Sequence, residues 1–236
     1  MIDKRVASLN QAVAGIGDGA TIHINGFGES GCPTELVHAL IDQGAKGLTV
    51  VSNNAGDGPI GLAALIRAGR VRKMICSFPR TQYGDAFREL YAKGEIELEI
   101  VAQGTLSERI RAAGAGIGAF YTPTTAGTPL ARGKETRNFG GRDQVLETPL
   151  GADFALVKAE RADRWGNLAY NKSARNFGPS MCMAAETTIV QAREIVELGA
   201  IDPEHVVTPG IFVDRVVEVP NPISEHEAIQ KEAVGS

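Results

Sequence analysis

Glycines at positions 26, 28 and 31 are the residues whose spacing points most directly to chemistry. They follow a β-branched run at residues 20–25 and precede a helical pattern that starts at Pro33. A strand, a Gly-x-Gly-x-x-Gly turn and a helix N-terminus are the parts that bring backbone N–H groups to a pyrophosphate in dinucleotide-binding proteins. The spacing therefore favours a phosphate-bearing ligand at this turn.

The end of the next predicted strand argues against a nicotinamide cofactor. Such a site needs an acidic residue about 20 positions after the glycines to hold the ribose hydroxyls. The predicted strand at residues 48–52 is instead followed by Asn53 and Asn54. The next acid, Asp57, lies in a Gly-Asp-Gly-Pro loop. Two neutral amides suit polar contacts to an acyl or amide group, and they also suit a tight turn. Both interpretations of the amides remain open.

The first half of the chain alternates between helical and extended patterns, which predicts an α/β fold. We expect strands at residues 20–25, 48–52, 73–77 and 96–101. We expect helices at 3–16, 33–43, 62–68 and 85–93, and a further one starting over 108–113. Helices of this length between strands indicate right-handed crossovers and a mostly parallel sheet flanked by helices.

The second half changes character and predicts a β-rich excursion. Residues 120–130 are loop-rich, and a Gly-Gly pair supplies a turn within 137–150. Extended segments follow at 154–157 and 211–219, and residues 186–197 fit a strand or a strand followed by a helix. We expect a single domain over 1–219 and a flexible C-terminal tail over 220–236, because that segment is polar with two early prolines.

Composition excludes several classes of function. The 236 residues carry a net charge of −4, and the basic residues are dispersed, which predicts no nucleic-acid partner. No apolar run approaches the roughly 20 residues that span a bilayer, and the N-terminus has no apolar segment of signal-peptide type. We therefore expect a cytoplasmic protein with no membrane association.

Cysteines and histidines predict neither a disulfide framework nor a metal site. The three cysteines are widely spaced, and no histidine lies near a cysteine in a finger-like pattern. We expect buried thiols, ordinary histidines and no metal. The residues are Cys32, Cys76, Cys182, His23, His38, His205 and His226.

Several segments in order resemble the A (alpha) chain of the family I CoA-transferases. The first is Asp-Gly-Ala-Thr-Ile-His-Ile-Asn-Gly-Phe-Gly-Glu-Ser-Gly-Cys-Pro at 18–33. The others are Val-Ser-Asn-Asn-Ala-Gly at 51–56, the stretch from Gln103 to Gly116, Ala-Phe-Tyr-Thr-Pro at 119–123, and Asn-Lys-Ser-Ala-Arg-Asn-Phe at 171–177. Together they cover about residues 3–219, which is far more specific than one glycine motif. The resemblance implies a CoA-transferase-like open α/β fold.

The family resemblance implies half of an enzyme. These enzymes move CoA between carboxylic acids through a glutamate in a Ser-Glu-Asn-Gly-type motif on a separate B (beta) subunit. This chain has no such motif, and Glu186 and Glu225 are better explained as solvated or ion-paired carboxylates. We therefore expect the partner to be a B (beta) subunit, in a heterotetramer of two alpha and two beta chains, and we expect acyl-CoA and a carboxylic acid to be the small-molecule ligands.

The same resemblance assigns roles to particular residues. Gln103 is similar to the glutamine of the family's oxyanion hole, and Asn54 is a weaker candidate for the same pocket. Coenzyme A enters as a co-substrate, with no permanently bound cofactor, and its binding is implied for a list of turn residues: Asn25, Gly26, Phe27, Gly28, Glu29, Ser30 and Gly31. Asn25 departs from the family, which usually has a glycine there, so a side chain could narrow the approach to CoA or contact it.

Substrate choice is implied by the branch that the chain resembles most. Segments 76–80, 163–167 and 202–213 are similar to the branch that acts on 3-oxoadipate, with succinyl-CoA as donor, in aromatic catabolism. Both acids are dicarboxylates, so a cation must meet the spectator carboxylate. Arg80 is our hypothesis for that cation, and a surface arginine is the alternative.

Other functions remain as alternatives. Within the family, the acceptor could be acetoacetate or another 3-oxoacid. Outside it, the glycine spacing alone supports an NAD-dependent oxidoreductase, and a stand-alone acyl-CoA-binding module would need no partner. Loss of activity in the isolated chain, with recovery on adding the partner, separates the first class from the other two.

Overall fold

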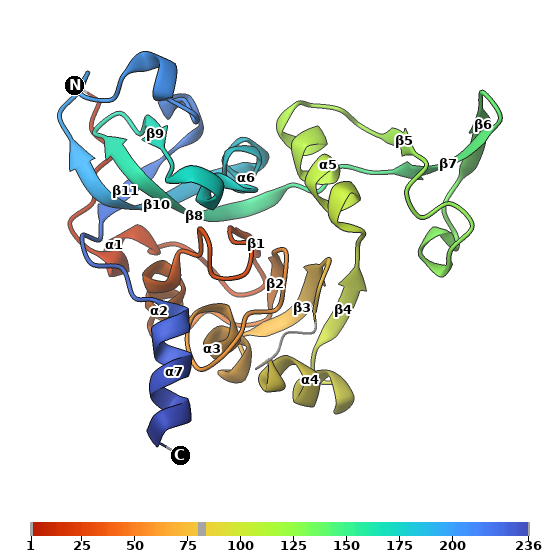
Figure 1. Ribbon diagram of the computed structural model, residues 1–236, viewed down its shortest axis with the longest axis horizontal. Helices are drawn as coiled ribbons and strands as arrows, with labels where there is room; N and C mark the ends of the chain where they lie inside the picture. The colour runs from red at the N-terminus through yellow and green to blue at the C-terminus, as the bar shows by residue number, and fades with distance from the viewer. Residues whose placement is uncertain (1, 80–83, 236) are drawn as a thin grey trace.

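A parallel β-sheet forms the centre of the computed structural model, which describes residues 2–79 and 84–235 (Figure 1). Its strand order is β11-β10-β8-β1-β2-β3-β4, and each neighbouring pair is parallel. The strands are β1 (Thr21–Ile24), β2 (Leu48–Val51), β3 (Val71–Cys76), β4 (Glu97–Ile100), β8 (Ala152–Asp163), β10 (Ala185–Val196) and β11 (Arg215–Glu218). A short β9 (Leu168–Ala169) pairs antiparallel with β8. The predicted α/β fold is confirmed.

Helices cover both faces of this sheet. One face packs against α1 (Leu9–Ala12), α2 (Thr34–Gln43), α3 (Gly61–Arg67) and α4 (Asp85–Ala92). The other packs against α5 (Gln103–Gly114) and α6 (Gly178–Ala184). All four residues of β2 are buried, as expected for a strand covered on both faces. Two apolar cores, one on each face, therefore fix the sheet.

Helix α2 shows how the predicted helices form. Its last residue is Gln43, and Gly44 follows in the left-handed conformation with φ of 101°. This is the glycine end of a helix that the sequence predicts, because glycine adopts positive φ without a Cβ penalty. The amino-terminal helix predicted over 3–16 is wrong beyond Leu9–Ala12. Residues Lys4 and Val6 instead exchange backbone hydrogen bonds with Val216 of β11, so long-range pairing overrides the apolar spacing.

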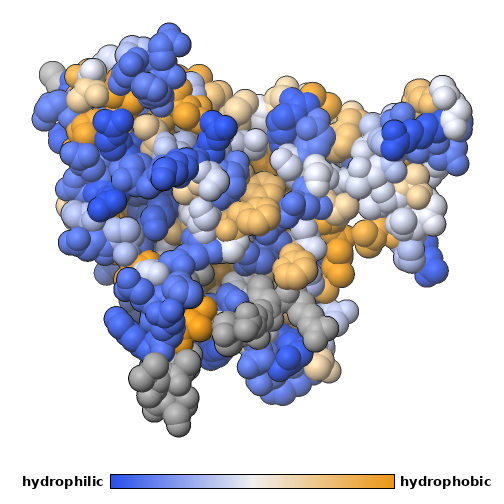
Figure 2. All heavy atoms as spheres, viewed as in Figure 1, coloured by the Kyte–Doolittle hydropathy of each residue, from blue (hydrophilic) through white to orange (hydrophobic). Residues whose placement is uncertain are grey.

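The chain segment that follows β4 and α5 and precedes β8 forms an antiparallel arm, which extends from the sheet (Figure 1). It consists of β5 (Phe120–Thr122), β6 (Thr136–Phe139) and β7 (Arg142–Glu147), with the short 3-10 helix η1 (Pro129–Ala131) between β5 and β6. The predicted excursion and its Gly-Gly turn are confirmed. Figure 2 shows apolar residues reaching the surface in the middle of this view and where the arm joins the body.

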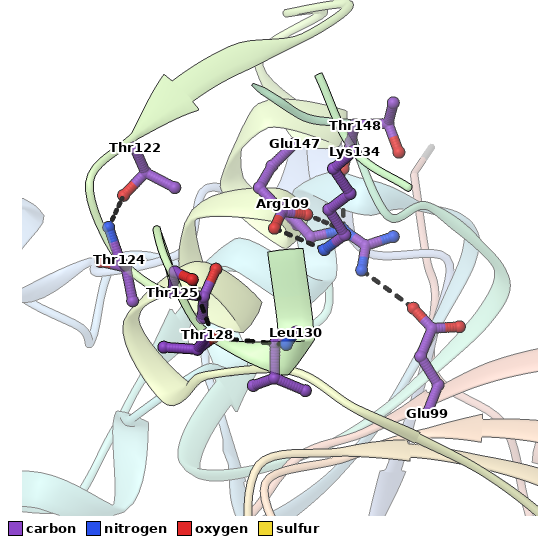
Figure 3. Close-up of polar contacts among 10 residues, drawn as sticks. All are labelled: Glu99, Arg109, Thr122, Thr124, Thr125, Thr128, Leu130, Lys134, Glu147 and Thr148. Carbon is purple, nitrogen blue, oxygen red and sulfur yellow. Dashed lines mark hydrogen bonds and ion pairs between the residues drawn. The ribbon is translucent and has the colours of Figure 1, made fainter. Parts of the chain in front are cut away.

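Arg109 of α5 anchors the arm to the body (Figure 3). Its Nη1 lies 3.0 Å from Oε1 of Glu99, and its Nε donates to the carbonyl of Thr148 at 2.8 Å. Glu147, which is 3 % exposed, also accepts from Lys134 at 2.6 Å. Because a buried carboxylate needs a paired cation, these contacts fix where β7 leaves the body.

The segment beyond residue 219, predicted as a flexible tail, contains a helix. Helix α7 spans Glu225–Gly235 and lies beside the rest of the chain (Figure 1). The backbone N–H of His226 donates to Glu29 at 3.1 Å, and that of Ile223 donates to buried Glu35. The domain boundary at residue 219 remains a prediction. Among the described residues no helix has the length and apolarity to cross a membrane.

Candidate active site

The predicted polar residues meet at the carboxyl edge of the parallel sheet. Asn25 follows β1, Asn53 and Asn54 follow β2, and Gln103 follows β4. Loops at this edge of an α/β sheet are where ligands bind, because consecutive strands deliver their ends side by side. The structure therefore brings these four residues to one edge of one sheet.

Gln103 is exposed and begins α5 directly after β4. The helix starts earlier than the 108–113 stretch suggested, so the amide stands at the N-terminus of a helix. Its Nε2 donates to Oδ1 of Asn53 at 2.7 Å. A primary amide carries two N–H donors; one is held by Asn53, and no acceptor for the second is found among the described residues. The positive end of the α5 dipole supports negative charge at the same place.

Asn53 was predicted only as one of two amides at a strand end, and its contact with Gln103 was not predicted. Asn53 is buried at 4 % exposure, and its backbone carbonyl accepts hydrogen bonds from the N–H groups of Ser77 and Phe78. The backbone that carries the Asn53 side chain is thus fixed by residues just after β3. The contact between the residues that follow β2 and β4, two strands separated by β3, reveals this pairing. The Asn-Asn pair was the signal that could have found it.

Asn54 is held locally. Its Oδ1 accepts the N–H of Gly56 at 2.8 Å, and its backbone forms a bridge with Phe78. This is the turn-forming use of asparagine. Among the described residues no partner is found for its Nδ2.

The turn after β1 is a tight hairpin. Phe27 and Ser30 exchange backbone hydrogen bonds at 3.0 and 3.2 Å, which places Gly28 and Glu29 at the tip. Gly31 has φ of 83°, and a Cβ there would lie 2.2 Å from the carbonyl of Ala174. Gly28 has φ of 58° with open space around it. Glycine is thus required at 31 for close packing and at 28 only for its backbone conformation.

Asn25 faces inward. It is fully buried, its backbone N–H donates to Leu156, and its Nδ2 donates to the carbonyl of Gly31 at 3.1 Å. The side chain therefore closes the turn from beneath. Phe27, at 52 % exposure, is the large apolar side chain that the turn presents to solvent.

The N-terminus of α2 is occupied by the protein's own side chains. The N–H of Leu36 donates to Oε1 of Gln191 at 3.1 Å, and Nε2 of Gln191 donates to Glu35 at 2.6 Å. Glu35 lies in the first turn of α2 and is buried. A dinucleotide pyrophosphate needs that helix end free for an anion. Despite its glycine spacing, this turn lacks the anion site of a nicotinamide enzyme.

Neither glutamate considered as an in-chain nucleophile joins this group. Glu186 is exposed at the start of β10, which is the amino edge of the sheet. Glu225 begins α7, in the segment after residue 219. Arg80 lies outside the described residues, so its role as the substrate cation stays a prediction.

Buried titratable groups near the site are held neutral. Burial lowers the pKa of His23, on β1, to about 4. Burial raises the pKa of the Cys76 and Cys182 thiols to about 12 each. Within the described ranges, no three His, Cys, Asp or Glu residues are placed to hold a metal ion. Among the described residues around Gln103, amide donors and a helix end, both uncharged, are therefore the chemistry on offer.

Comparison with known proteins shows the family of this chain. Residues 6–219 match the protein family described as coenzyme A transferase. The chain is 62 % identical over 219 residues to the A (alpha) chain of 3-oxoadipate CoA-transferase from Pseudomonas putida, covering 93 % of this chain and 95 % of that one. It is 53 % identical to the A (alpha) chain of succinyl-CoA:3-ketoacid coenzyme A transferase from Xanthomonas campestris, covering 91 % and 88 %.

Solved structures share the fold. The apoenzyme of an acyl-CoA transferase from Escherichia coli O157:H7 superposes with a TM-score of 0.82 at 21 % identity, and this chain covers half of that chain's length. Glutaconate coenzyme A-transferase from Acidaminococcus fermentans gives 0.82 at 22 % identity, over 92 % of this chain and 75 % of that one. Because the family match spans the whole sheet and every residue of the carboxyl edge described above, this chain belongs to the coenzyme A transferase family.

Proposed function

We propose that this chain is the alpha subunit of an enzyme that moves CoA from succinyl-CoA to 3-oxoadipate. The observation that carries the proposal is the identity of 62 % and 61 % to two relatives named as the corresponding chain of 3-oxoadipate CoA-transferase. Relatives named for 3-ketoacids stand at 53 % and 49 %. Another 3-oxoacid such as acetoacetate is therefore the second candidate acceptor.

Transfer proceeds in two halves through a carboxylate on a partner beta subunit. The glutamate attacks the succinyl thioester, releases the CoA thiolate and forms a mixed anhydride. The thiolate then attacks the glutamyl carbonyl, which frees succinate and leaves a glutamyl-CoA thioester. The same steps in reverse load 3-oxoadipate. Splitting the transfer in this way avoids holding both acids at once.

This chain supplies the neutral donors for these steps. Every tetrahedral intermediate places negative charge on a former carbonyl oxygen, and preorganised donors stabilise that charge. The second N–H of the Gln103 amide fits this role, since Asn53 fixes the first at 2.7 Å. Asn53 is a positioning residue. Two alpha and two beta chains complete the enzyme in this proposal.

Arg80 is proposed to select a dicarboxylate acceptor. An arginine binds a carboxylate through paired N–H donors. 3-Oxoadipate has a second carboxylate, away from the reacting one, for Arg80 to bind, whereas acetoacetate has a single carboxylate. In the complex with the beta subunit, Arg80→Ala should lower kcat/KM for 3-oxoadipate by about 10²-fold, the worth of a lost charge-assisted pair, and leave acetoacetate transfer nearly unchanged. Initial rates with both acceptors measure this ratio. An equal loss on both acceptors would exclude Arg80 as the selecting cation, and a wild-type complex that prefers acetoacetate would overturn the proposed acceptor.

A further inference from the structure

An exposed aromatic ring stands at the carboxyl edge of the sheet and has no role in the steps above. Phe78 lies two residues beyond the end of β3 and is 60 % exposed. Among the described large apolar residues, only Ile211 exposes a greater fraction, at 82 %. Single exposed apolar side chains are common on protein surfaces and need no function. The surroundings of Phe78 therefore have to show whether its ring has one.

Asn53 is in contact with both Phe78 and Gln103. Its backbone carbonyl accepts the N–H of Phe78 at 3.0 Å, and its side-chain Oδ1 accepts Nε2 of Gln103 at 2.7 Å. Asn54, the next residue, forms a backbone bridge with Phe78. The residue that carries the ring and the proposed donor amide therefore share one buried support.

The strand register also brings Phe78 and Gln103 to neighbouring strand ends. Strands β3 and β4 are parallel neighbours, and Cys76 of β3 pairs with Ile100 of β4. Phe78 stands two residues beyond Cys76, and Gln103 stands three residues beyond Ile100. Adjacent strands lie about 4.8 Å apart. The fold therefore delivers the aromatic residue and the amide side by side at the carboxyl edge.

The reacting acyl group must start next to these residues. An oxyanion is stabilised when it lies about 2.7–3.1 Å from its donor, so the carbon chain of the acyl group begins beside the Gln103 amide. Succinyl and 3-oxoadipyl groups both contain methylene carbons. Methylene groups gain free energy when an apolar surface replaces the water around them. An aromatic ring at the neighbouring strand end supplies such a surface.

Water is the competing reactant at this edge, because the proposed glutamyl thioester is a reactive acyl donor. In hydrolysis the oxygen of a water molecule bonds to the glutamyl carbonyl carbon and the C–S bond breaks. The CoA thiolate leaves with one proton of that water, the other proton goes to solvent, and the glutamate carboxylate is regenerated. This reaction consumes succinyl-CoA without loading the acceptor. Excluding water from an active site prevents side reactions of this kind.

We propose that the Phe78 ring forms an apolar wall of the active site, which packs against the methylene carbons of the acyl group and keeps water from the glutamyl thioester. This inference rests on the proposed CoA transfer and deepens it. Gln103 stabilises the oxyanion whichever nucleophile attacks, whereas the Phe78 wall favours attack by the acceptor over attack by water. The alpha subunit thereby takes part in the choice between transfer and hydrolysis.

Phe78→Ala in the complex with the beta subunit tests the wall. Release of free CoA thiol from succinyl-CoA without an acceptor measures hydrolysis, and formation of 3-oxoadipyl-CoA with the acceptor measures transfer. Loss of the ring should raise the ratio of hydrolysis to transfer about tenfold, the effect of losing one apolar contact surface of this size. Phe78→Leu keeps an apolar side chain, so its ratio should stay within about threefold of the wild type.

Two control variants separate the wall from other roles. Ile211→Ala removes another exposed apolar side chain, in the 3-10 helix η4 (Gly210–Phe212), and should leave both rates unchanged. Gln103→Ala should slow hydrolysis and transfer together and leave their ratio near the wild-type value, because an oxyanion donor serves either nucleophile. The thermal midpoint of Phe78→Ala should match that of the wild type, since the ring is exposed.

The outcomes distinguish failure of the wall from failure of the proposed function. An active wild-type complex with an unchanged ratio in Phe78→Ala would overturn the wall alone. Weaker assembly with the beta subunit in size-exclusion chromatography, with an unchanged ratio in the assembled fraction, would also overturn it and would assign the ring to the subunit contact. A wild-type complex that transfers no CoA would contradict the proposed function, and the wall would fall with it.

Discussion

Gln103 and Asn53 act as one unit at the residue scale. The 2.7 Å hydrogen bond between them uses one amide N–H and leaves the other fixed in direction. A donor that is already oriented costs no reorganisation when an oxyanion forms. The resemblance to the family indicated Gln103, but the partner that orients it appears only when the ends of β2 and β4 are brought together.

Replacing Gln103 by alanine should therefore reduce turnover. In the complex with the beta subunit we expect kcat for CoA transfer to fall about 10²–10³-fold, the typical effect of losing one oxyanion donor. Stopped assays at saturating succinyl-CoA measure it. Glu108→Gln is a matched control on the same helix, because among the described residues the Glu108 side chain pairs with Arg111 alone. Unchanged turnover in Gln103→Ala would contradict the assignment.

His23 makes stability depend on pH. Burial lowers the pKa of His23 from 6.5 to about 4. Between pH 6.5 and pH 4, His23 is therefore protonated in the unfolded chain and neutral in the folded chain. The contribution of neutral His23 to the free energy of unfolding is fully present above pH 6.5 and is lost as the pH falls towards 4. His23→Leu should flatten this dependence relative to the wild type. Urea unfolding at pH 7 and pH 4.5 compares the two, and parallel losses in both proteins would rule out His23 as a cause.

Sequence patterns predict the local features of helices and strands better than the contacts between distant segments. Helix α2 ends at Gly44 as predicted, because its stop signal is local. The helix predicted over 3–16 shrinks to Leu9–Ala12, because Lys4 and Val6 pair with Val216. Helix α7 was not predicted, since its residues are polar, and its neighbours include Glu29 and Glu35 far back in the chain. The periodicity of apolar residues does not predict such pairing between segments that are distant in the sequence.

The hairpin turn separates two uses of glycine. Gly31→Ala should lower the free energy of unfolding by about 3 kcal/mol, because positive φ and a Cβ 2.2 Å from the Ala174 carbonyl add together. Gly28→Ala should cost about 1 kcal/mol, because only φ opposes it. Chemical denaturation of both variants gives the difference. Equal losses would mean that the turn and the 171–176 segment do not pack as described.

The same comparison explains which site residues the sequence could supply. Glycines, the Asn-Asn pair and Gln103 stand in short motifs that a resemblance can carry. The pairing of Asn53 with Gln103 stands in no motif, because it exists only when the residues after β2 and β4 come together. Asn25 shows the converse, because its unusual position suggested ligand contact and the structure buries it.

The whole molecule presents an incomplete catalytic surface. Neutral donors and a helix end lie along one edge, while the glutamates considered as nucleophiles lie at the other edge or in α7. The arm, fixed at Arg109, extends away from the sheet and carries exposed Phe139. Together these features fit a protein that completes its site with a partner.

Reconstitution tests the central claim most directly. This chain and the beta subunit are purified separately. Each chain alone and the mixture of the two are assayed for CoA transfer from succinyl-CoA to 3-oxoadipate. We predict no transfer by either chain alone and transfer by the mixture, with CoA bound covalently to a glutamate of the beta subunit during turnover. Transfer by this chain alone, or none by an assembled mixture, would contradict it.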